Sequence, residues 1–312
     1  MQGERVIEKK LGVLYSVGAF TIWGFLPIYW KLIREVSSVA IVGHRIVWSF
    51  VFMIAIILVL RKWSIFKAEL RRTFKNKKTA LCITLAAITI TINWLTYIWG
   101  VNNNHILETS LGYYINPLIS ILLGMIFLKE RFNGLKWLAF LLAIAGVLYM
   151  SFHFGSIPWI ALLLAFSFAI YGLLKKTVDL SAMFGLTIET LVLTPFAAIY
   201  LFSLEAGHWS SIEWLSFTPL LLVGAGILTA IPLLLFASGA KRIPLSMLGF
   251  LQYIAPTMTL IIGVFVYHEP FSYVHLVSFI LIWLGLLTYS YSVFKTREKS
   301  AKQSPPDGVN SI

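Results

Sequence analysis

Charged residues are scarce in this chain, and they are bunched. Of the 312 residues, only 12% are Asp, Glu, Lys or Arg, whereas a typical soluble domain has about 25%. Hydrophobic residues make up 59% of the chain, in long runs between the charges. This composition excludes an ordinary soluble core. It predicts a polytopic membrane protein, in which helices pack against one another in lipid.

Cysteine is nearly absent as well, and so are the short motifs of common enzymes. The one cysteine, Cys82, lies in an apolar run, so neither a disulfide framework nor a cysteine metal site is predicted. The sequence has no Walker loop, dinucleotide-binding fingerprint or His-Glu-x-x-His, and its six histidines show no ligand spacing. No cofactor, metal or ATP-hydrolysing domain is therefore expected.

Ten apolar runs are long enough to span a membrane, which takes about 20 mostly apolar residues as a helix. The runs lack the alternation of barrel strands and are too long for them. The predicted fold class is therefore all-α integral membrane, with residues 1–10 as a cytoplasmic N-terminus and 295–312 as a disordered cytoplasmic tail. The predicted helices cover residues 11–33, 39–60, 79–101, 106–128, 135–152, 158–174, 182–203, 215–237, 245–267 and 274–294.

Basic residues gather on one side of this arrangement. If the N-terminus is cytoplasmic, all of the 25 Lys and Arg residues fall on the inner side except Lys31, Arg34 and Arg45. This bias predicts a multi-pass protein of the cell membrane with both termini in the cytoplasm. The basic stretch 61–78 is interpreted as an inner-surface loop attracted to anionic lipid, and no nucleic-acid partner is expected.

Two stretches of the chain are related to each other. Residues 93–150 align on 232–289 without a gap, and twelve of the 58 aligned positions are identical. With five helices, an odd number, in each half, consecutive halves must enter the membrane from opposite sides. Residues 11–152 and 153–294 are therefore predicted to be inverted five-helix repeats around one central cavity. The identical pairs include Gly100/Gly239, Tyr114/Tyr253, Pro117/Pro256, Glu130/Glu269 and Gly146/Gly285.

Three segments also resemble a known family: HRIVWS at 44–49, NWLTYIWGVNNNHILETSLGYYINPL at 93–118 and GFLQYIAPT at 249–257. In their joint order and spacing they resemble the RarD group of EamA permeases, in the drug/metabolite transporter superfamily. The resemblance spans residues 7–294 and implies a plasma-membrane permease of the alternating-access type.

The expected function is thus a secondary-active or facilitative permease for a small amphipathic metabolite or drug, without enzyme activity. Two alternatives stay open. An integral membrane enzyme would need a catalytic cluster at the membrane interface, and a ligand sensor would bind without flux. The expected partners are a small-molecule substrate and the lipid bilayer, and a homodimer is left open.

Ionisable residues inside the predicted helices are the first candidates for a site, because a charge in lipid is costly. Arg45, beside His44, is interpreted as a substrate or counter-ion site, or else as a structural ion pair. Glu189, at a repeat-related position, is interpreted as a partner of Arg45, a proton-coupling group or part of a static ion pair. Glu108 is either a gate or proton acceptor at the cavity mouth, or a carboxylate near a helix N-terminus in an outer loop.

Prolines, amides and aromatic rings complete the predicted site. Pro117 and Pro256 each remove a backbone donor and are predicted to kink their helices near the midplane. Glu130 and Glu269 precede helix starts and are interpreted as structural caps. The remaining candidates either line the cavity or pack in the core: Trp23, Asn93, Tyr97, Tyr113, Tyr114, Asn116, Tyr171, Gln252 and Tyr253.

Overall fold

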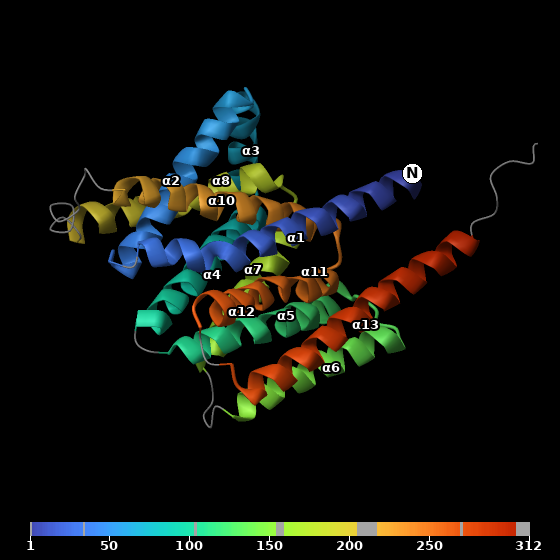
Figure 1. The fold of residues 1–312 in the computed structure, drawn as a ribbon. Helices are drawn as coiled ribbons and strands as arrows, with labels where there is room; N and C mark the ends of the chain where they lie inside the picture. Colours follow the sequence, from blue (N-terminus) through green and yellow to red (C-terminus); the bar gives the residue numbers. More distant parts are fainter. Residues whose placement is uncertain are drawn as a thin grey trace, which may run out of the picture. The chain divides into compact units, whose positions relative to one another are not determined.

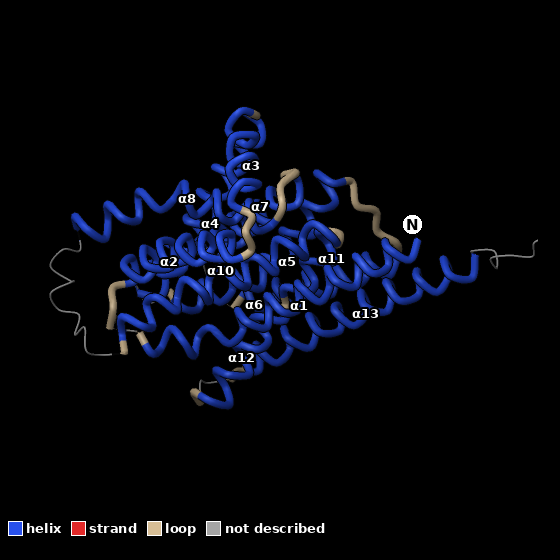
Figure 2. Tube along the Cα trace, turned by 90° about the horizontal axis from the view of Figure 1, so that it is seen from above, coloured by secondary structure: helices blue, strands red, loops and turns tan. Residues whose placement is uncertain are grey.

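A computed structural model describes residues 2–33, 35–102, 105–153, 159–204, 217–268 and 271–303 (Figure 1). Figure 2 shows that helices joined by short loops make up this part of the chain, and no strand occurs in it. Ten helical segments of the described residues are long and apolar enough to cross a membrane. The predicted fold class, an all-α membrane protein with ten spanning helices, is confirmed.

Most of the helices follow one another with few residues between them. Up to residue 152 they are α1 (Gln2–Leu32), α2 (Ser38–Val59), α3 (Trp63–Lys75), α4 (Lys77–Asn102), α5 (Ile106–Leu128) and α6 (Gly134–Phe152). The second half contains α7 (Trp159–Thr177), α8 (Ala182–Ile199) with the π-helical turn η1 (Tyr200–Leu204), α10 (Thr218–Arg242), α11 (Leu245–Gln252), α12 (Ile254–Val266) and α13 (Tyr273–Gln303). Side chains of Ser37, Asn133 and Ser181 cap the starts of α2, α6 and α8.

The basic stretch 61–78 contains a helix, α3, and not the loop that its charges predicted. α3 buries Phe66 and Thr73, while its lysines and arginines are exposed. The ring centroids of Phe66 and Phe184 of α8 are 6.0 Å apart. Apolar or small residues at every third or fourth position give this helix a buried face, and the dense charges of the opposite face hid the pattern.

The predicted helix over 245–267 is divided at Tyr253. The Tyr253 N–H donates to the carbonyl of Phe250, three residues back, where a regular α-helix would reach the fourth. Pro256 follows in the first turn of α12 and has no N–H for the carbonyl of Gln252, so the helix opens there. α5, by contrast, runs without interruption through Pro117. Of the two predicted kinks, only the one near Pro256 interrupts a helix.

The last helix is longer than predicted. α13 continues to Gln303, whereas the polar composition predicted disorder from residue 295. Lys, Arg, Glu, Ala and Gln dominate this extension, and all of them favour helix. The rest of the tail, residues 304–312, lies outside the described residues.

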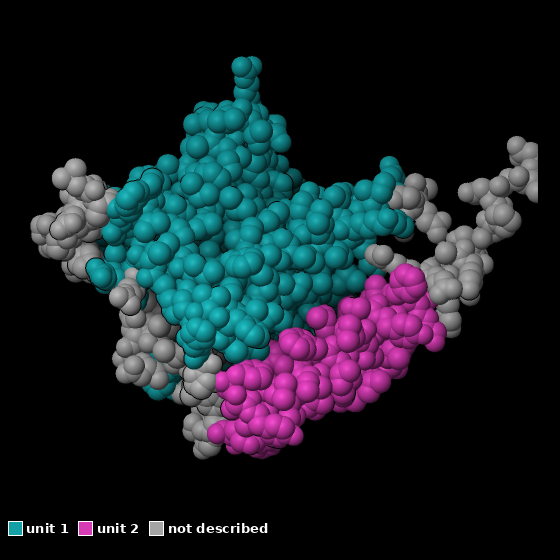
Figure 3. Space-filling model, viewed as in Figure 1, with its two compact units in different colours: residues 1–130, 157–270 teal, residues 131–156, 271–312 magenta. Residues whose placement is uncertain are grey.

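The chain forms two compact units (Figure 3). The larger unit consists of Met1–Glu130 and Ile157–Pro270, and the smaller one of Arg131–Ser156 and Phe271–Ile312. In the larger unit, helices of one half pack mainly on helices of the other, and these contacts come in matched pairs. α1 packs on α10 as α7 packs on α4, α1 on α12 as α7 on α5, and α2 on α10 as α8 on α4. In each of these three comparisons, replacing both helices of the first contact by their counterparts in the other half gives the second contact.

The smaller unit repeats this relationship in a single helix pair, α6 and α13. A Cβ added at Gly146 would lie 2.8 Å from the carbonyl oxygen of Ser278, and one at Gly285 would lie 2.8 Å from that of Ala139. Ser278 and Gly285 are the partners of Ala139 and Gly146 in the sequence repeat. The two helices are therefore antiparallel, and two equivalent glycine contacts let their backbones approach closely.

Backbone conformation matches between the halves as well. Lys129 follows α5 and His268 lies just beyond α12, at aligned positions of the repeat. Both have a backbone φ of 54°, in the left-handed region that residues other than glycine seldom adopt. Repeat-related helices thus end in the same way.

Candidate functional site

Arg45 is a buried cation in α2. Its side chain is 7% exposed, and its Nε donates a hydrogen bond to Thr229 Oγ1 of α10 at 2.9 Å. The Thr229 hydroxyl in turn donates to the carbonyl of Ala225 at 2.7 Å, which leaves an oxygen lone pair to accept from Arg45. The guanidinium is therefore held against α10 in a defined orientation.

Close packing of α2 on α10 sets up this hydrogen bond. A Cβ at Gly226 would lie 2.6 Å from the backbone nitrogen of Ser49, so only glycine allows the observed approach. Ser49 Oγ donates to the Gly226 carbonyl at 2.8 Å. Because Arg45 is one turn from Ser49 and Thr229 is one turn from Gly226, the contact between small residues brings the cation to its acceptor.

Aromatic side chains of three further helices surround the guanidinium. The Arg45 Cζ lies 4.8 Å from the ring centroid of Trp30 in α1 and 4.6 Å from that of Trp94 in α4. Tyr97 of α4 and Tyr113 of α5 are close enough to interact electrostatically with Arg45, and their ring centroids are 5.6 Å apart. We call Trp30, Arg45, Trp94, Tyr97, Tyr113 and Thr229 the Arg45 site.

The Arg45 charge has no negative partner in the described part of the chain. The ion pairs among described side chains join other residues, and none brings a carboxylate within 4.0 Å of Arg45. Indole faces attract a cation but carry no net charge. The Arg45 site is therefore positive overall.

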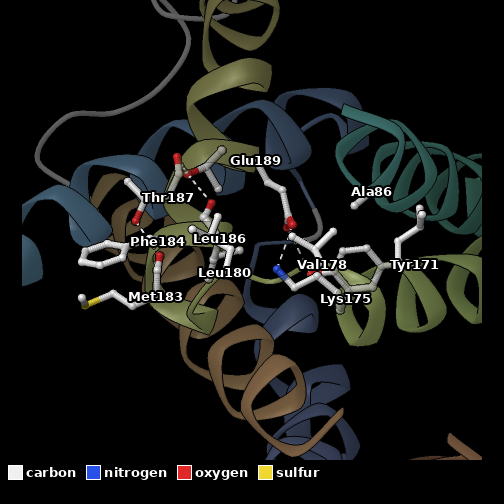
Figure 4. A network of polar contacts seen from close by, with 12 residues as sticks. Ala86, Tyr171, Lys175, Val178, Leu180, Met183, Phe184, Leu186, Thr187 and Glu189 are labelled. Atoms are coloured by element: carbon white, nitrogen blue, oxygen red, sulfur yellow. Dashed lines mark hydrogen bonds and ion pairs between the residues drawn. The ribbon is translucent and has the colours of Figure 1, made fainter. Parts of the chain in front are cut away.

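Glu189, considered as a partner of Arg45, pairs with Lys175 (Figure 4). Oε1 of Glu189 lies 2.8 Å from Nζ of Lys175, and the two side chains are 3% and 5% exposed. The Tyr171 hydroxyl donates to Glu189 Oε2 at 3.4 Å. A cavity of about 10 Å³ adjoins the pair, enough for one water molecule. The arrangement fits a static ion pair between α7 and α8, with Lys175 as the partner.

Trp23 and Tyr171, the repeat-related aromatics, belong to one cluster of rings. The ring of Tyr171 stacks on Phe236, with centroids 5.8 Å apart and 14° between the planes. Trp23 lies 5.7 Å from the same Phe236 ring and 5.5 Å from Phe168. Of the two alternatives for this pair, core packing is the one that these contacts support.

Tyr114 and Tyr253 link the two proline-bearing helices. The hydroxyl of Tyr114 donates to the carbonyl of Pro256 at 3.4 Å, and the hydroxyl of Tyr253 donates to the carbonyl of Tyr114 at 3.3 Å. Both side chains are buried. Their hydroxyls are thus used in joining α5 to α11 and α12.

Asn116 and Gln252 are buried amides with unused hydrogen-bonding atoms. Their side chains are 7% and 4% exposed. Gln252 Oε1 accepts from Ser120 Oγ at 3.3 Å, but Gln252 Nε2 and Asn116 Oδ1 have no hydrogen-bond partner among the described residues. Because Asn116 is one helical turn from Tyr113, its free acceptor lies on the helix face that carries a residue of the Arg45 site.

Asn93, predicted to line the cavity together with Tyr97, forms hydrogen bonds between two helices. Its Nδ2 donates to the Leu164 carbonyl at 2.9 Å and to Ser167 Oγ at 3.1 Å, which joins α4 to α7. His44 is buried in α2. Glu108 is part of α5, but its side chain lies outside the described residues.

Glu130 caps a helix, although a different one from that predicted. Its Oε1 accepts from the Leu245 N–H at 2.5 Å and its Oε2 from the Ser246 N–H at 2.9 Å. The carboxylate therefore caps α11, more than 100 residues away, while Asn133 caps the helix that follows in sequence. Glu269 lies outside the described residues.

Lysines tie together the ends of α7 and α10. Lys176 Nζ donates to the carbonyls of Ala240 and Ile243, at 3.0 and 2.6 Å. Lys241 Nζ in turn donates to the carbonyls of Val178 and Leu180. Each helix thus contributes a lysine that donates to carbonyls at or just beyond the end of the other helix, and these hydrogen bonds hold the two helix ends together.

Sequence reasoning missed Trp30, Thr229 and Lys175. Trp30 and Thr229 carry no sequence signal, because they become site residues only through contacts between distant helices. Lys175 was counted among the surface lysines at the end of its helix. No group of three or more His, Cys, Asp or Glu side chains that could hold a metal ion occurs among the described residues.

Three observations together indicate a membrane transport protein. Ten helices of the described residues could span a membrane, helices of the larger unit pack in matched pairs, and a buried cation in that unit has aromatic neighbours. A family model confirms this: that of the EamA-like transporter family matches residues 10–152 and 156–291. The chain belongs to the EamA-like transporter family, and it is a multi-pass membrane transporter of the drug/metabolite superfamily.

Similar proteins cover almost the whole chain. The uncharacterized transporter YojE of Bacillus subtilis is 51% identical over 297 residues, which are 94% of this chain and 98% of that protein. Protein RarD of Escherichia coli K12 is 44% identical and covers 95% of this chain and 99% of its own. A crystal structure at 17% identity has a TM-score of 0.69 over 91% of this chain and 98% of the other, which shows a shared fold.

Proposed function

We propose that the protein is a permease that moves a small amphipathic metabolite or drug across the cell membrane by alternating access. The observation that carries this proposal is the charge of Arg45, which has no negative partner among the described residues and which four other helices, from both halves, surround. A charge inside a membrane helix costs about 3 kcal/mol or more and usually marks a substrate or ion pathway. Trp30, Trp94 and Tyr97 add the apolar surface that an amphipathic solute needs.

Alternating access requires two halves that can exchange roles, and we infer that the halves are inverted repeats. The matched helix pairs of the larger unit and the equivalent glycine contacts of Gly146 and Gly285 support this inference. Two antiparallel helices related by a two-fold axis lie perpendicular to that axis. For helices that cross the bilayer, such an axis lies in the membrane plane.

The inverted arrangement has a direct test at Lys129 and His268. Both are exposed, and inversion assigns them to opposite membrane surfaces, with Lys129 in the cytoplasm along with the two termini. Lys129→Cys and His268→Cys, each in a Cys82→Ser background, would be labelled in intact cells with a membrane-impermeant maleimide. Only the His268→Cys protein should react from outside. Labelling of both from the same side would contradict inverted repeats.

Proton coupling is a further part of the proposal, through Glu108 and Glu189. Because Lys175 already compensates the Glu189 charge, coupling through Glu189 would require this 2.8 Å pair to break during the cycle. The double variant Glu108→Gln with Glu189→Gln should abolish uptake that is driven by a pH gradient in proteoliposomes. Unchanged uptake would remove this part of the proposal and leave facilitative transport.

Transport itself is tested by flux. Purified protein would first be screened for solutes that raise its thermal unfolding midpoint, and the hits then measured for uptake into proteoliposomes. Uptake should fall strongly in Arg45→Gln and stay unchanged in Arg71→Gln, which removes the same charge from the exposed face of α3. Binding without flux would favour a sensor, and recovery of a chemically altered solute would favour an enzyme.

A further inference from the structure

Most of the hydrogen-bonding capacity of the Arg45 guanidinium is unused among the described residues. A guanidinium offers five N–H donors, and the hydrogen bond found for Arg45 in the described part of the chain runs from Nε to Thr229. The terminal nitrogens, Nη1 and Nη2, form the two-pronged end of the group. Two parallel N–H groups at that end match the two oxygens of a carboxylate.

The charge balance of the Arg45 site limits the ligand to a single negative charge. Arg45 supplies one positive charge, and the other residues of the site are aromatic rings and a hydroxyl. Lys175, a second fully buried cation, is neutralised by Glu189. A dianion such as a phosphate monoester would therefore retain an uncompensated charge, and an ammonium group would be repelled.

The walls of the site favour a flat, apolar body behind the carboxylate. Trp30 and Trp94 flank the cation at 4.8 and 4.6 Å, and the rings of Tyr97 and Tyr113 continue the aromatic surface. The Tyr113 side chain is 38% exposed, whereas Arg45, with which it interacts, is buried. Aromatic rings stack favourably on such walls in offset or edge-to-face contacts.

On this geometry we propose that the Arg45 site binds aromatic monocarboxylates, with the carboxylate on Nη1 and Nη2 of Arg45 and the ring between the indole and phenol side chains. The inference rests on the proposed transport function, since it names the substrate class of the same site. It also gives Thr229 a role as a positioning residue. By holding Nε, Thr229 turns the two terminal nitrogens toward the ligand.

Binding to the detergent-purified protein tests this directly. The probes are phenylacetate, the uncharged phenylacetamide, the cationic phenethylamine and the small anion acetate, each titrated by calorimetry. Phenylacetate should bind most tightly, and Arg45→Gln should weaken it about tenfold or more, as expected for a lost hydrogen-bonded charge partner. Arg45→Lys should keep part of the preference for the acid over the amide, and Arg71→Gln should bind as the wild type does.

The wild-type comparison stands even if Arg45→Gln does not fold. Equal affinity for phenylacetate and phenylacetamide, no binding of phenylacetate at all, or undiminished binding in Arg45→Gln would each overturn the proposal. Its failure can be told apart from failure of transport. Binding that depends on Arg45 without flux would contradict the permease alone, whereas flux with no preference for acids would contradict the substrate class alone.

Discussion

Glu189 and Lys175 meet inside the protein, with Oε1 and Nζ 2.8 Å apart and both side chains almost completely withdrawn from solvent. The pair joins α7 to α8, and a hydrogen bond from Tyr171 to the second carboxylate oxygen completes it. Two opposite charges in such a place depend on each other, because removing one leaves the other buried without compensation.

Lys175→Met should therefore destabilise the protein by about 3–5 kcal/mol, because it leaves the Glu189 carboxylate unpaired. Adding Glu189→Leu should restore most of the loss. Equilibrium unfolding in mixed micelles measures both effects. Arg72→Gln is the control, since its ion pairs with Glu69 and Asp179 are exposed and should contribute little. If the double variant were as unstable as Lys175→Met alone, the loss of stability could not come from the unpaired Glu189 carboxylate, and the ion pair itself would be needed for stability.

Thr229→Val tests how far the Arg45 site is preorganised. Valine keeps the shape of the side chain but removes the acceptor of the Arg45 Nε, which should cost about 1–3 kcal/mol of stability and lower the affinity for the transported solute. Thr89→Val provides the comparison, because the Thr89 hydroxyl bonds only carbonyls of its own helix in the described part of the chain. Equal behaviour of the two variants in unfolding and binding would argue against a positioning role.

Gly226→Val should separate α2 from α10. The added side chain meets the backbone at Ser49, so overpacking should cost about 1–3 kcal/mol, and Arg45 should lose its contact with Thr229. The thermal midpoint and solute uptake should fall together. Gly134→Ala is the control, because a Cβ at Gly134 has no neighbour within 4 Å among the described residues. A Gly226→Val protein with normal uptake would mean that this close contact is dispensable.

Asn116→Leu should raise stability while lowering transport. The Oδ1 of Asn116 is buried without a hydrogen-bond partner among the described residues, so replacing the amide removes an uncompensated polar group worth about 1–3 kcal/mol. Asn93→Leu should instead lower stability, because it removes the hydrogen bonds of the Asn93 amide to Leu164 and Ser167. Parallel unfolding curves and uptake assays separate the two. If Asn116→Leu instead destabilised the protein, this would argue against the idea that the unpartnered Asn116 amide oxygen is kept for binding the solute.

The sequence was sufficient for the spanning helices, because run length and hydrophobicity decide whether a segment enters lipid, wherever its neighbours lie. It identified Arg45 for the same reason, since a charge in such a run is conspicuous. The partners of Arg45 were not accessible in this way. Trp30, Trp94 and Thr229 are ordinary residues of membrane helices, and only the packing of α1, α4 and α10 around α2 brings them to the cation.

Two predictions made from neighbouring residues in the sequence were right in kind but wrong in position. Pro256 was expected to bend its helix, but the interruption falls at Tyr253, because a proline removes the hydrogen bond of the carbonyl four residues earlier. Glu130 was expected to cap the next helix in sequence, but α11 supplies its N–H partners. The helix interruption and the carboxylate cap were thus both predicted, but not their positions, because the position depends on which helices pack together.

The contrast between α5 and the α11–α12 pair has a consequence for the transport cycle. One sequence module occurs here in two shapes, straight through Pro117 and broken ahead of Pro256. If the halves trade conformations, the opposite-facing state should have α5 opened at Tyr114 and a single continuous helix from Leu245 to Val266. Each half would then show the conformation that the other half adopts in the opposite-facing state. A crosslink that keeps α11 and α12 collinear should favour that state.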